Sequence, residues 1–189
     1  MGSRNSLTKL VALPRPSKKV WVALGLLGIG AVVTLVLLWS RDEPLPPYGT
    51  SVGLRAPEFA LVALDGKKVA LSDYRGQVVL VLFWQSTCPD CGKALPEARR
   101  LWEKYRRRGL AFLGINLDHD PQTAIQYLQS QGYTDQLTLW DSFEAAMGVV
   151  TLYEVPYVPF FLIVDRRGIL RFRGVYPAVP TEAELERWL

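Results

Sequence analysis

The chemistry that this sequence could perform is concentrated in two cysteines. Cys88 and Cys91 are the only cysteines in the chain, and Pro89 and Asp90 separate them. Two thiols at this spacing can form a disulfide with each other and reopen it. A purely structural bridge would stabilise the fold little, because the entropic gain from a cross-link grows with the length of the loop that it closes. The spacing therefore predicts a redox-active pair rather than a structural disulfide or two incidental thiols.

The two thiols are expected to act one after the other. An apolar run ends shortly before Cys88 and a helical pattern follows it, which places its sulfur near unpaired N–H groups and the positive end of a helix dipole. Such surroundings favour the thiolate, so Cys88 is predicted to attack a disulfide as the nucleophile. Cys91 is then predicted to attack the mixed disulfide and release the product. The same steps in reverse would oxidise a substrate.

The residues around the thiols bear on the redox potential of the pair. Asp90 brings a negative charge close to Cys88 and opposes formation of the thiolate, whereas Lys93 favours it. Pro89 and Asp90 are accordingly predicted to tune the potential. We expect a moderately reducing couple, because a destabilised thiolate favours the oxidised form of the pair.

The segments on either side of the cysteines predict buried strands and an amphipathic helix. Val78–Trp84 is a continuous run of apolar β-branched and aromatic residues, which is typical of a strand buried on both faces. Apolar residues from Leu95 to Tyr105 recur every three or four positions and predict a helix that ends before Gly109. Ala111–Asp118 predicts a second buried strand.

The remaining segments complete an α/β pattern. We expect a hairpin of Phe59–Leu64 and Val69–Leu71 around Asp65 and Gly66, a helix over about Pro121–Gln131, a short apolar stretch at Leu137–Trp140, a helix from about Phe143 on the way to Val155, a hairpin of Phe160–Asp165 and Ile169–Val175, and a terminal helix over Glu182–Leu189. Thr181 and Glu184 form a capping-box pattern at the start of the terminal helix. This order predicts an α/β domain with a mixed sheet flanked by helices on both faces.

The net positive charge of the chain comes from its first residues. The formal net charge is +4, but residues 1–19 contain five basic side chains and no acidic one. The rest of the chain carries 17 basic and 18 acidic side chains. The basicity is thus a property of the tail, and no nucleic-acid partner is predicted.

An uncharged segment follows this tail. Residues 20–39 would form about 30 Å of helix, enough to span the hydrocarbon core of a lipid bilayer. Trp21 and Trp39 stand at its ends, and lysines flank only the end that faces the tail. We predict a single transmembrane anchor, with residues 1–19 as a cytoplasmic basic tail and the later residues outside the cytoplasm. A cleaved signal peptide is the alternative, but the apolar stretch is long for one and no A-x-A-like site follows closely.

A change in composition marks the start of the functional domain. Residues 40–51 contain three prolines, which favour an extended chain, and are predicted to form a Pro-rich linker. Residues 52–189 are then predicted to form one domain, because their number suits a single hydrophobic core.

Metal chemistry offers an alternative use of the thiols. The single histidine, His119, and two cysteines are too few for a closed zinc site of four ligands, and no cofactor is predicted. Reduced Cys88 and Cys91 could still hold Cu(I), because soft thiolates select that ion. A copper-binding assembly factor for a respiratory oxidase is therefore one alternative function, and a disulfide oxidase or isomerase is another.

The run VLFWQSTCPDCGKALPEARRL resembles the thioredoxin superfamily, in particular its membrane-anchored TlpA/ResA-like branch. The similarity covers about residues 53–175 and includes APEFALVALDGKKVALSDYRGQ, FLGINLD and YEVPYVPFFLIVDRRGIL. It implies a thioredoxin-like fold and the reduction of protein disulfides outside the cytoplasm, including those of apocytochrome c during cytochrome c maturation. It also implies that electrons come from a membrane thiol carrier.

The resemblance further implies a substrate-binding proline loop. Pro159 matches the proline that is cis in thioredoxin-like folds and faces the cysteines, and Pro156 is the nearby alternative. The backbone beside this proline binds an extended substrate segment in the family, which would give Val158 and Pro159 a substrate-binding role.

Two positions depart from the resembled families. Leu82 stands where thioredoxins carry a buried Asp, and Ala94 stands where ResA-like proteins carry a Glu. Those acids help to move the proton of the resolving thiol, here Cys91. Glu97 cannot replace them, because six residues along a helix bring its side chain to another face. Proton transfer is therefore expected to rely on water.

Overall fold

The computed structural model of the protein describes residues 44–189. The predicted basic tail, the predicted anchor at 20–39 and the start of the predicted linker lie outside the described residues. No helix within residues 44–189 is both long enough and apolar enough to cross a membrane. Residues 45–189 form one structural unit.

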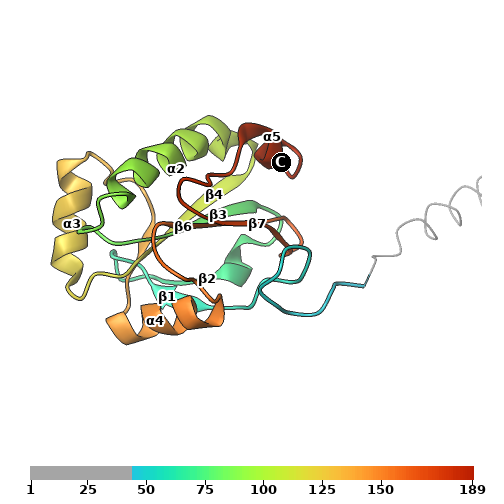
Figure 1. Cartoon of the computed structure of the whole chain (residues 1–189), viewed down its shortest axis with the longest axis horizontal. Coiled ribbons are helices and arrows are strands. Elements are labelled where there is room, and N and C mark those ends of the chain that lie inside the picture. The colour runs from blue at the N-terminus through green and yellow to red at the C-terminus, as the bar shows by residue number, and fades with distance from the viewer. Residues whose placement is uncertain (1–43) are drawn as a thin grey trace, which may run out of the picture. The chain divides into compact units, whose positions relative to one another are not determined.

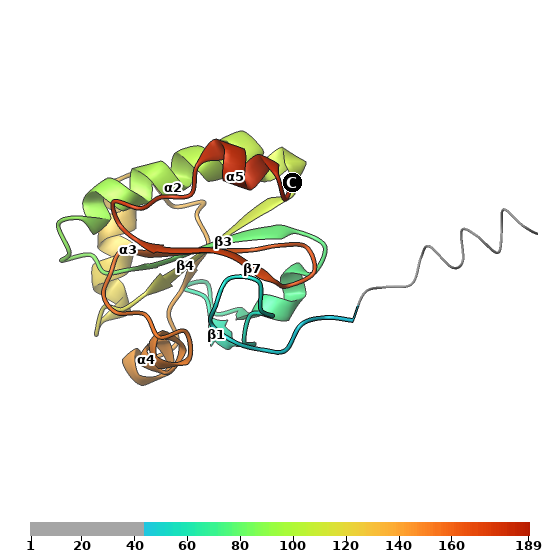
Figure 2. The same cartoon turned by 45° about the vertical axis from the view of Figure 1, so that its right-hand side comes forward.

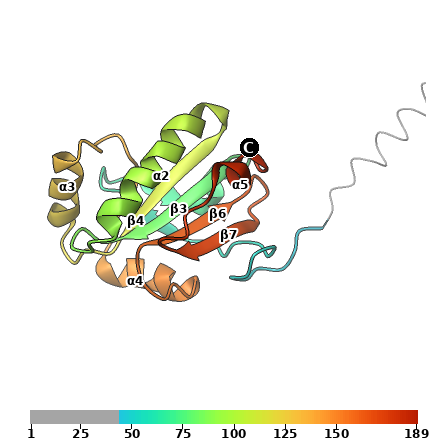
Figure 3. The same ribbon diagram turned by 45° about the horizontal axis from the view of Figure 1, so that its top comes forward.

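A five-stranded sheet lies at the centre of the described domain, with the strands in the order β5-β4-β3-β6-β7. The strands are β3 (Val78–Trp84), β4 (Leu110–Asn116), β5 (Thr138–Leu139), β6 (Phe160–Val164) and β7 (Leu170–Val175). The first three run parallel to one another, whereas β6 pairs antiparallel with both β3 and β7. The predicted mixed sheet is confirmed, and the strand that leads to the cysteines is its central strand (Figure 3).

Helices cover both faces of this sheet, as Figures 1 and 2 show. The outer elements are β1 (Ala60–Val62), β2 (Lys68–Ala70), α2 (Cys91–Tyr105), α3 (Pro121–Ser130), α4 (Phe143–Leu152), α5 (Glu182–Glu186) and the 3-10 helices η1 (Leu71–Tyr74) and η2 (Arg106–Arg108). One face is covered by α2, α3 and α5. The other face is covered by α4, η1 and the antiparallel β1–β2 hairpin.

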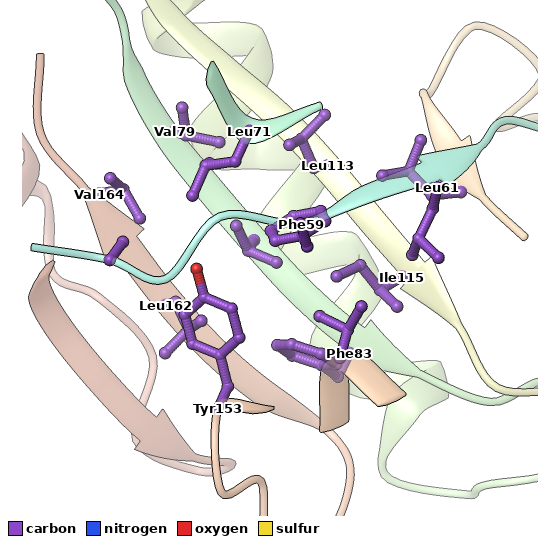
Figure 4. Packing of buried hydrophobic residues seen from close by; sticks show 14 of the residues in the cluster. Phe59, Leu61, Leu71, Val79, Phe83, Leu113, Ile115, Tyr153, Leu162 and Val164 are labelled. Carbon is purple, nitrogen blue, oxygen red and sulfur yellow. The ribbon is translucent and has the colours of Figure 1, made fainter. Parts of the chain in front are cut away.

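The alternation of side chains along β3 explains why its sequence is apolar throughout. Every residue of β3 is buried. Its odd-numbered side chains join the cluster beneath the hairpin and α4, and its even-numbered side chains join the cluster beneath α2, α3 and α5. In the first cluster, the Tyr153 ring lies 6.3 Å from that of Phe83 and meets that of Phe59 edge-on (Figure 4). Packing on both faces fixes the strand from which the cysteine turn departs.

The strand β4 and the terminal helix end earlier than the sequence predicts. β4 stops at Asn116 rather than Asp118, because the Asn116 side-chain oxygen accepts the backbone N–H of Asp118 at 3.0 Å and replaces a ladder bond. The terminal helix begins with the predicted capping box but ends at Glu186. Beyond it, the ring of Trp188 packs beneath the Arg171 guanidinium, 4.0 Å from the ring centre.

The described part of the predicted linker lies against the domain. The backbone N–H of Gly49 donates to the carbonyl of Arg55 at 2.9 Å, and the N–H of Arg55 donates to the carbonyl of Pro47 at 2.9 Å. The Thr50 hydroxyl donates to the Glu154 carboxylate at 3.0 Å. The last residues of the predicted linker are therefore bonded to the domain.

Candidate active site

The turn between β3 and α2 holds both cysteines. α2 begins at Cys91, with Asp90 as its N-cap residue, so Cys88 lies just outside the helix. The Cys88 sulfur accepts the backbone N–H of Cys91 at 3.3 Å. This contact places the sulfur at the positive end of α2. Both cysteines are free thiols in this structure.

The Cys88 thiol opens onto an apolar groove of about 450 Å³. Residues from the end of β4, from α4 and from the loop before β6 form its walls, and Pro89 lies beside the thiol. Leu117 and Met147 contribute aliphatic surface, and Tyr157 stands 66% exposed. An apolar groove beside a half-buried sulfur is suited to hold an exposed apolar polypeptide segment.

The loop before β6 approaches the cysteines at a cis peptide bond. The bond between Val158 and Pro159 is cis, which confirms Pro159 over Pro156 as the proline that the resemblance implied. The Cys88 thiol donates to the carbonyl oxygen of Val158 at 3.8 Å. The fold thus brings Val158 beside the sulfur from a distant part of the sequence.

Cys91 lies in surroundings that differ from those of Cys88. It is 1% exposed and packs among apolar side chains of β3 and α2. Burial raises the pKa of the Cys91 thiol, and so do its contact with Cys88 and the charge of Asp118, whereas a hydrogen bond from the backbone of Gln85 lowers it. Cys91 is therefore a protonated thiol at neutral pH.

The positions that carry an acid in the resembled families are apolar in this core. Leu82 in β3 and Ala94 in α2 are both fully buried. Glu97 lies on another face of α2, where its carboxylate accepts a hydrogen bond from Arg100 at 3.2 Å. None of these three residues can take a proton from Cys91.

A buried carboxylate nevertheless lies near the thiols, and the sequence interpretation missed it. Asp118 follows the end of β4 and is 3% exposed. Its oxygens accept the backbone N–H of Ser86 at 3.1 and 3.3 Å and the side-chain amide of Asn116 at 2.9 Å. A signal was present, because carboxyl ends of neighbouring parallel strands meet at one sheet edge. A residue after β4 therefore belongs beside the residues after β3.

The other candidates singled out in the sequence lie at the surface. Asp90 and Lys93 form an exposed ion pair at 2.7 Å, and Asp90 raises the pKa of the Lys93 ammonium through this hydrogen bond. His119 is exposed, and its ring stacks on that of Phe143 with 3.8 Å between their centres. Within residues 44–189, no group of three or more His, Cys, Asp or Glu side chains is placed to hold a metal ion.

A Cys-x-x-Cys turn at a helix N-terminus, opposite a cis proline and on a mixed sheet, defines a thioredoxin-like thiol-disulfide oxidoreductase. The chain belongs to the AhpC/TSA family, whose family model matches residues 52–173. The predicted thioredoxin-like fold and oxidoreductase class are therefore confirmed.

Curated relatives and solved structures agree on this class. The thiol-disulfide oxidoreductase ResA of Geobacillus kaustophilus is 27% identical over 139 residues, which are 74% of this chain and 76% of that protein. The structure of a putative thiol:disulfide interchange protein DsbE from Chlorobium tepidum is 28% identical, with a TM-score of 0.62 over 74% of this chain and 96% of that one. The protein is thus an oxidoreductase of the ResA/DsbE type.

A third similarity concerns the fold alone. The thioredoxin domain of a thiol-disulfide oxidoreductase from Bacteroides vulgatus has a TM-score of 0.62 at 21% identity, over 67% of this chain and 90% of that one. The arrangement of sheet and helices is therefore shared by proteins whose sequences have diverged widely.

Proposed function

We propose that this oxidoreductase reduces disulfides of exported proteins on the outer side of a membrane, with Cys88 as the attacking thiol and Cys91 as the resolving thiol. The observation that carries the proposal is the contrast between the two sulfurs. Cys88 is half-buried beside an apolar groove and accepts an N–H group at the start of α2, whereas Cys91 is buried and its pKa is raised by burial. One thiol can reach a substrate and the other can reach only its neighbour.

The reaction consists of two thiol-disulfide exchanges. In the first, the Cys88 thiolate bonds to one sulfur of the substrate disulfide, and the other sulfur leaves and takes up a proton. In the second, Cys91 loses its proton and bonds to the Cys88 sulfur, and the remaining substrate sulfur leaves as a thiolate. The substrate gains two electrons and the cysteine pair loses them. A membrane thiol carrier would return two electrons to the pair.

The substrate would lie along the groove and the loop before β6. Val158 and Pro159 stand beside Cys88 at the start of β6, where an extended segment can pair with the backbone. The apolar walls favour a segment that is unfolded when its disulfide is reduced, since a folded substrate would bury such residues. Apocytochrome c, whose haem-attachment cysteines must be reduced before haem is added, fits this description and is the substrate that the resemblance implies.

A moderately reducing potential is supported by the state of Cys91. A dithiol is a strong oxidant when its reduced form is stabilised, as happens when a thiolate is strongly favoured. Burial and the neighbouring carboxylate instead raise the pKa of Cys91, so its thiolate contributes no such stabilisation at neutral pH. Pro89 and Asp90 are proposed to adjust the potential from within the turn.

The proposed location follows from the first part of the chain. Residues 1–19 would form a cytoplasmic basic tail, residues 20–39 a membrane anchor, and residues 40–51 a linker to the oxidoreductase domain at 52–189. The uncharged stretch, the tryptophans at its two ends and the lysines at one end support this arrangement. An anchored reductase would share the membrane with its electron carrier.

Trapping of mixed disulfides tests the proposal directly. In Cys91→Ser, the second exchange cannot occur, so we expect exported proteins to accumulate on Cys88 in membranes and to be released by a reducing agent. The matched control is the double variant Cys88→Ser with Cys91→Ser, which should capture nothing. Absence of any trapped protein, together with tight Cu(I) binding by the reduced wild type, would instead favour a copper-binding assembly factor.

A further inference from the structure

The exposed large hydrophobic side chains of the domain gather in two short segments. Within residues 44–189 they are Leu45, Tyr48, Val52, Leu152 and Tyr157, each at least 42% exposed. The first three lie in residues 44–53, which contain no charged side chain. The last two lie in residues 151–157, whose one charged side chain is that of Glu154. Such clustering is informative, because single exposed hydrophobic residues are normally scattered over a protein surface.

Hydrogen bonds join the two segments to each other. The Thr50 hydroxyl donates to the carboxylate of Glu154 at 3.0 Å. The guanidinium of Arg173 in β7 donates to the backbone carbonyl of Thr50 and, at 3.3 Å, to that of Glu154. Leu152 and Tyr157 are two and three residues from Glu154, so their Cα atoms lie within about 11 Å of its Cα atom. The five exposed hydrophobic residues thus share one region of the surface, which we call the apolar face.

The first of these segments is bonded to the sheet. The backbone N–H of Gly53 donates to the carbonyl of Leu170 in β7 at 2.8 Å. The ring of Tyr48 lies against the Arg55 guanidinium, with 4.4 Å between the guanidinium carbon and the ring centre. The side chains of Tyr48 and Val52 are therefore presented to solvent as part of the surface of the domain.

The proposed membrane anchor ends only a few residues before the apolar face. Leu45 comes six residues after Trp39, the last residue of that anchor. A chain spans at most about 3.6 Å per residue, so Leu45 cannot be more than about 22 Å from the hydrocarbon edge of the bilayer. The headgroup layer itself is about 5–8 Å deep on each side. The tether therefore attaches to the domain at its apolar face and holds this face near the lipid.

We propose that the apolar face rests on the outer surface of the membrane, an assignment that depends on the membrane anchor of the proposed function. Leu45, Tyr48 and Val52 enter the interfacial layer, where tyrosine rings are favoured. Glu154 and Arg173 stay at the level of the polar headgroups, which accept charged side chains. A tethered face meets the lipid at a high effective concentration, so a few apolar side chains suffice to hold it there.

This orientation brings the active site beside the membrane. Val155 and Tyr157 line the groove onto which the Cys88 thiol opens, and Tyr157 also belongs to the apolar face. A membrane thiol carrier can then present its cysteines to Cys88 while the domain stays on the lipid surface. The tether favours lipid over a second copy of the chain as the occupant, because it holds every copy at the membrane but holds no two copies together.

Spin labels on single cysteines test what the apolar face contacts. The full-length chain with Cys88→Ser and Cys91→Ser receives Val52→Cys or Leu152→Cys, is reconstituted in phosphatidylcholine vesicles and is labelled from the outside. The matched control is Ser130→Cys, an exposed site at the end of α3, which lies at the other end of the domain from residues 45–53 (Figures 1 and 3).

The measurement compares collisions of each label with oxygen and with a nickel chelate. Oxygen concentrates in the bilayer and the chelate stays in water, so we expect the ratio of the two collision rates to be at least about fivefold higher at positions 52 and 152 than at position 130. Adding Leu45→Ser and Tyr48→Ser should lower the ratio at position 152 to the control value, because the face then loses two of its apolar side chains.

The other possible results separate this proposal from the proposed function. Control ratios at positions 52 and 152, in a chain that floats with the vesicles, would overturn the membrane contact and leave the anchor intact. Spin–spin broadening together with control ratios would assign the face to a second copy of the chain. Lipid contact at position 52 alone would refute the orientation of the active site. A chain that does not float with the vesicles would refute the anchor, and the membrane contact with it.

Discussion

Two buried carboxylates at opposite edges of the sheet have contrasting surroundings. Asp118 follows β4 at the edge that holds the cysteine turn, and Asp165 follows β6, which runs antiparallel to β3 and so ends at the other edge. They are 3% and 7% exposed. Burial of this kind is costly for a carboxylate unless donors compensate it. The two sites compensate it in different ways.

Asp165 is held as a structural acceptor. Its carboxylate accepts the backbone N–H groups of Arg167 and Ile169, each at 2.9 Å, and the side-chain Nε of Arg171 at 2.7 Å. The first two bonds shape the β6–β7 turn, and the third supplies a cation. Together these bonds keep the hairpin closed.

Asp118 has donors but no cation within the described residues, and it lies among other polar groups that are incompletely bonded. The indole N–H of Trp84 and the hydroxyl of Ser86 are buried without a hydrogen-bond partner in residues 44–189. The Cys91 thiol is buried beside them. Within residues 44–189, the carboxylate of Asp165 is thus matched by a cation, whereas that of Asp118 is matched only by neutral donors.

The largest expected effect is a loss of stability when the carboxylate of Asp165 is removed. Asp165→Ala would leave Arg171 half-buried without its partner and two turn N–H groups without an acceptor. We expect the free energy of unfolding to fall by about 3 kcal/mol, as measured by urea denaturation of the reduced chain. Asp118→Asn, which strands no cation, should lose less than about 1 kcal/mol. Equal losses at the two sites would refute the distinction.

The next effect concerns pH and the buried thiol. The pKa of Cys91 is raised in the folded chain, so above about pH 8.5 the unfolded chain loses this proton while the folded chain keeps it. The unfolded state then binds fewer protons, and stability falls as the pH rises, by up to about 1.4 kcal/mol per pH unit. Below about pH 8.5 both states are protonated and this contribution is fully present.

Urea denaturation between about pH 8 and pH 10 measures this effect. The reduced wild type should lose about 1–2 kcal/mol more than Cys91→Ser over that range, because serine does not titrate there. The tyrosines whose pKa is raised by burial, Tyr74, Tyr127 and Tyr153, are present in both chains and cancel. Parallel stability curves for the two chains would show that Cys91 is not protected from ionisation.

The sequence predicts those features of this fold that follow from local pattern. The apolar run of β3 requires cover on both faces, and the capping box of Thr181 and Glu184 is formed as expected. Features that depend on tertiary contacts could not be predicted from local sequence. The closeness of Val158 to Cys88 came only from the family resemblance, and the cis bond between Tyr176 and Pro177 had no sequence signal.

Asp118 shows why the site was only partly predictable. The sequence placed Asp118 inside a strand, where alternation alone would decide which way its side chain points. In the structure, the Asn116 side chain ends β4 first and turns Asp118 toward Ser86. The end of a strand can depend on such a side-chain hydrogen bond. The partner of Asp118 depends on the order of the strands in the sheet, which local sequence does not show.

The smallest expected effect concerns the exposed ion pair beside the cysteine turn and the rate of mixed-disulfide formation. Lys93 pairs with Asp90 one turn from Cys88, but both side chains are more than half exposed and solvent screens them. We expect Lys93→Ala to change the rate of mixed-disulfide formation by less than about threefold, and less still at high salt. The matched control is Lys67→Ala, which breaks a similarly exposed pair with Asp65 on the hairpin. A tenfold loss in Lys93→Ala alone would mean that surface charge governs Cys88 and that the buried carboxylate is not the main electrostatic difference between the two edges.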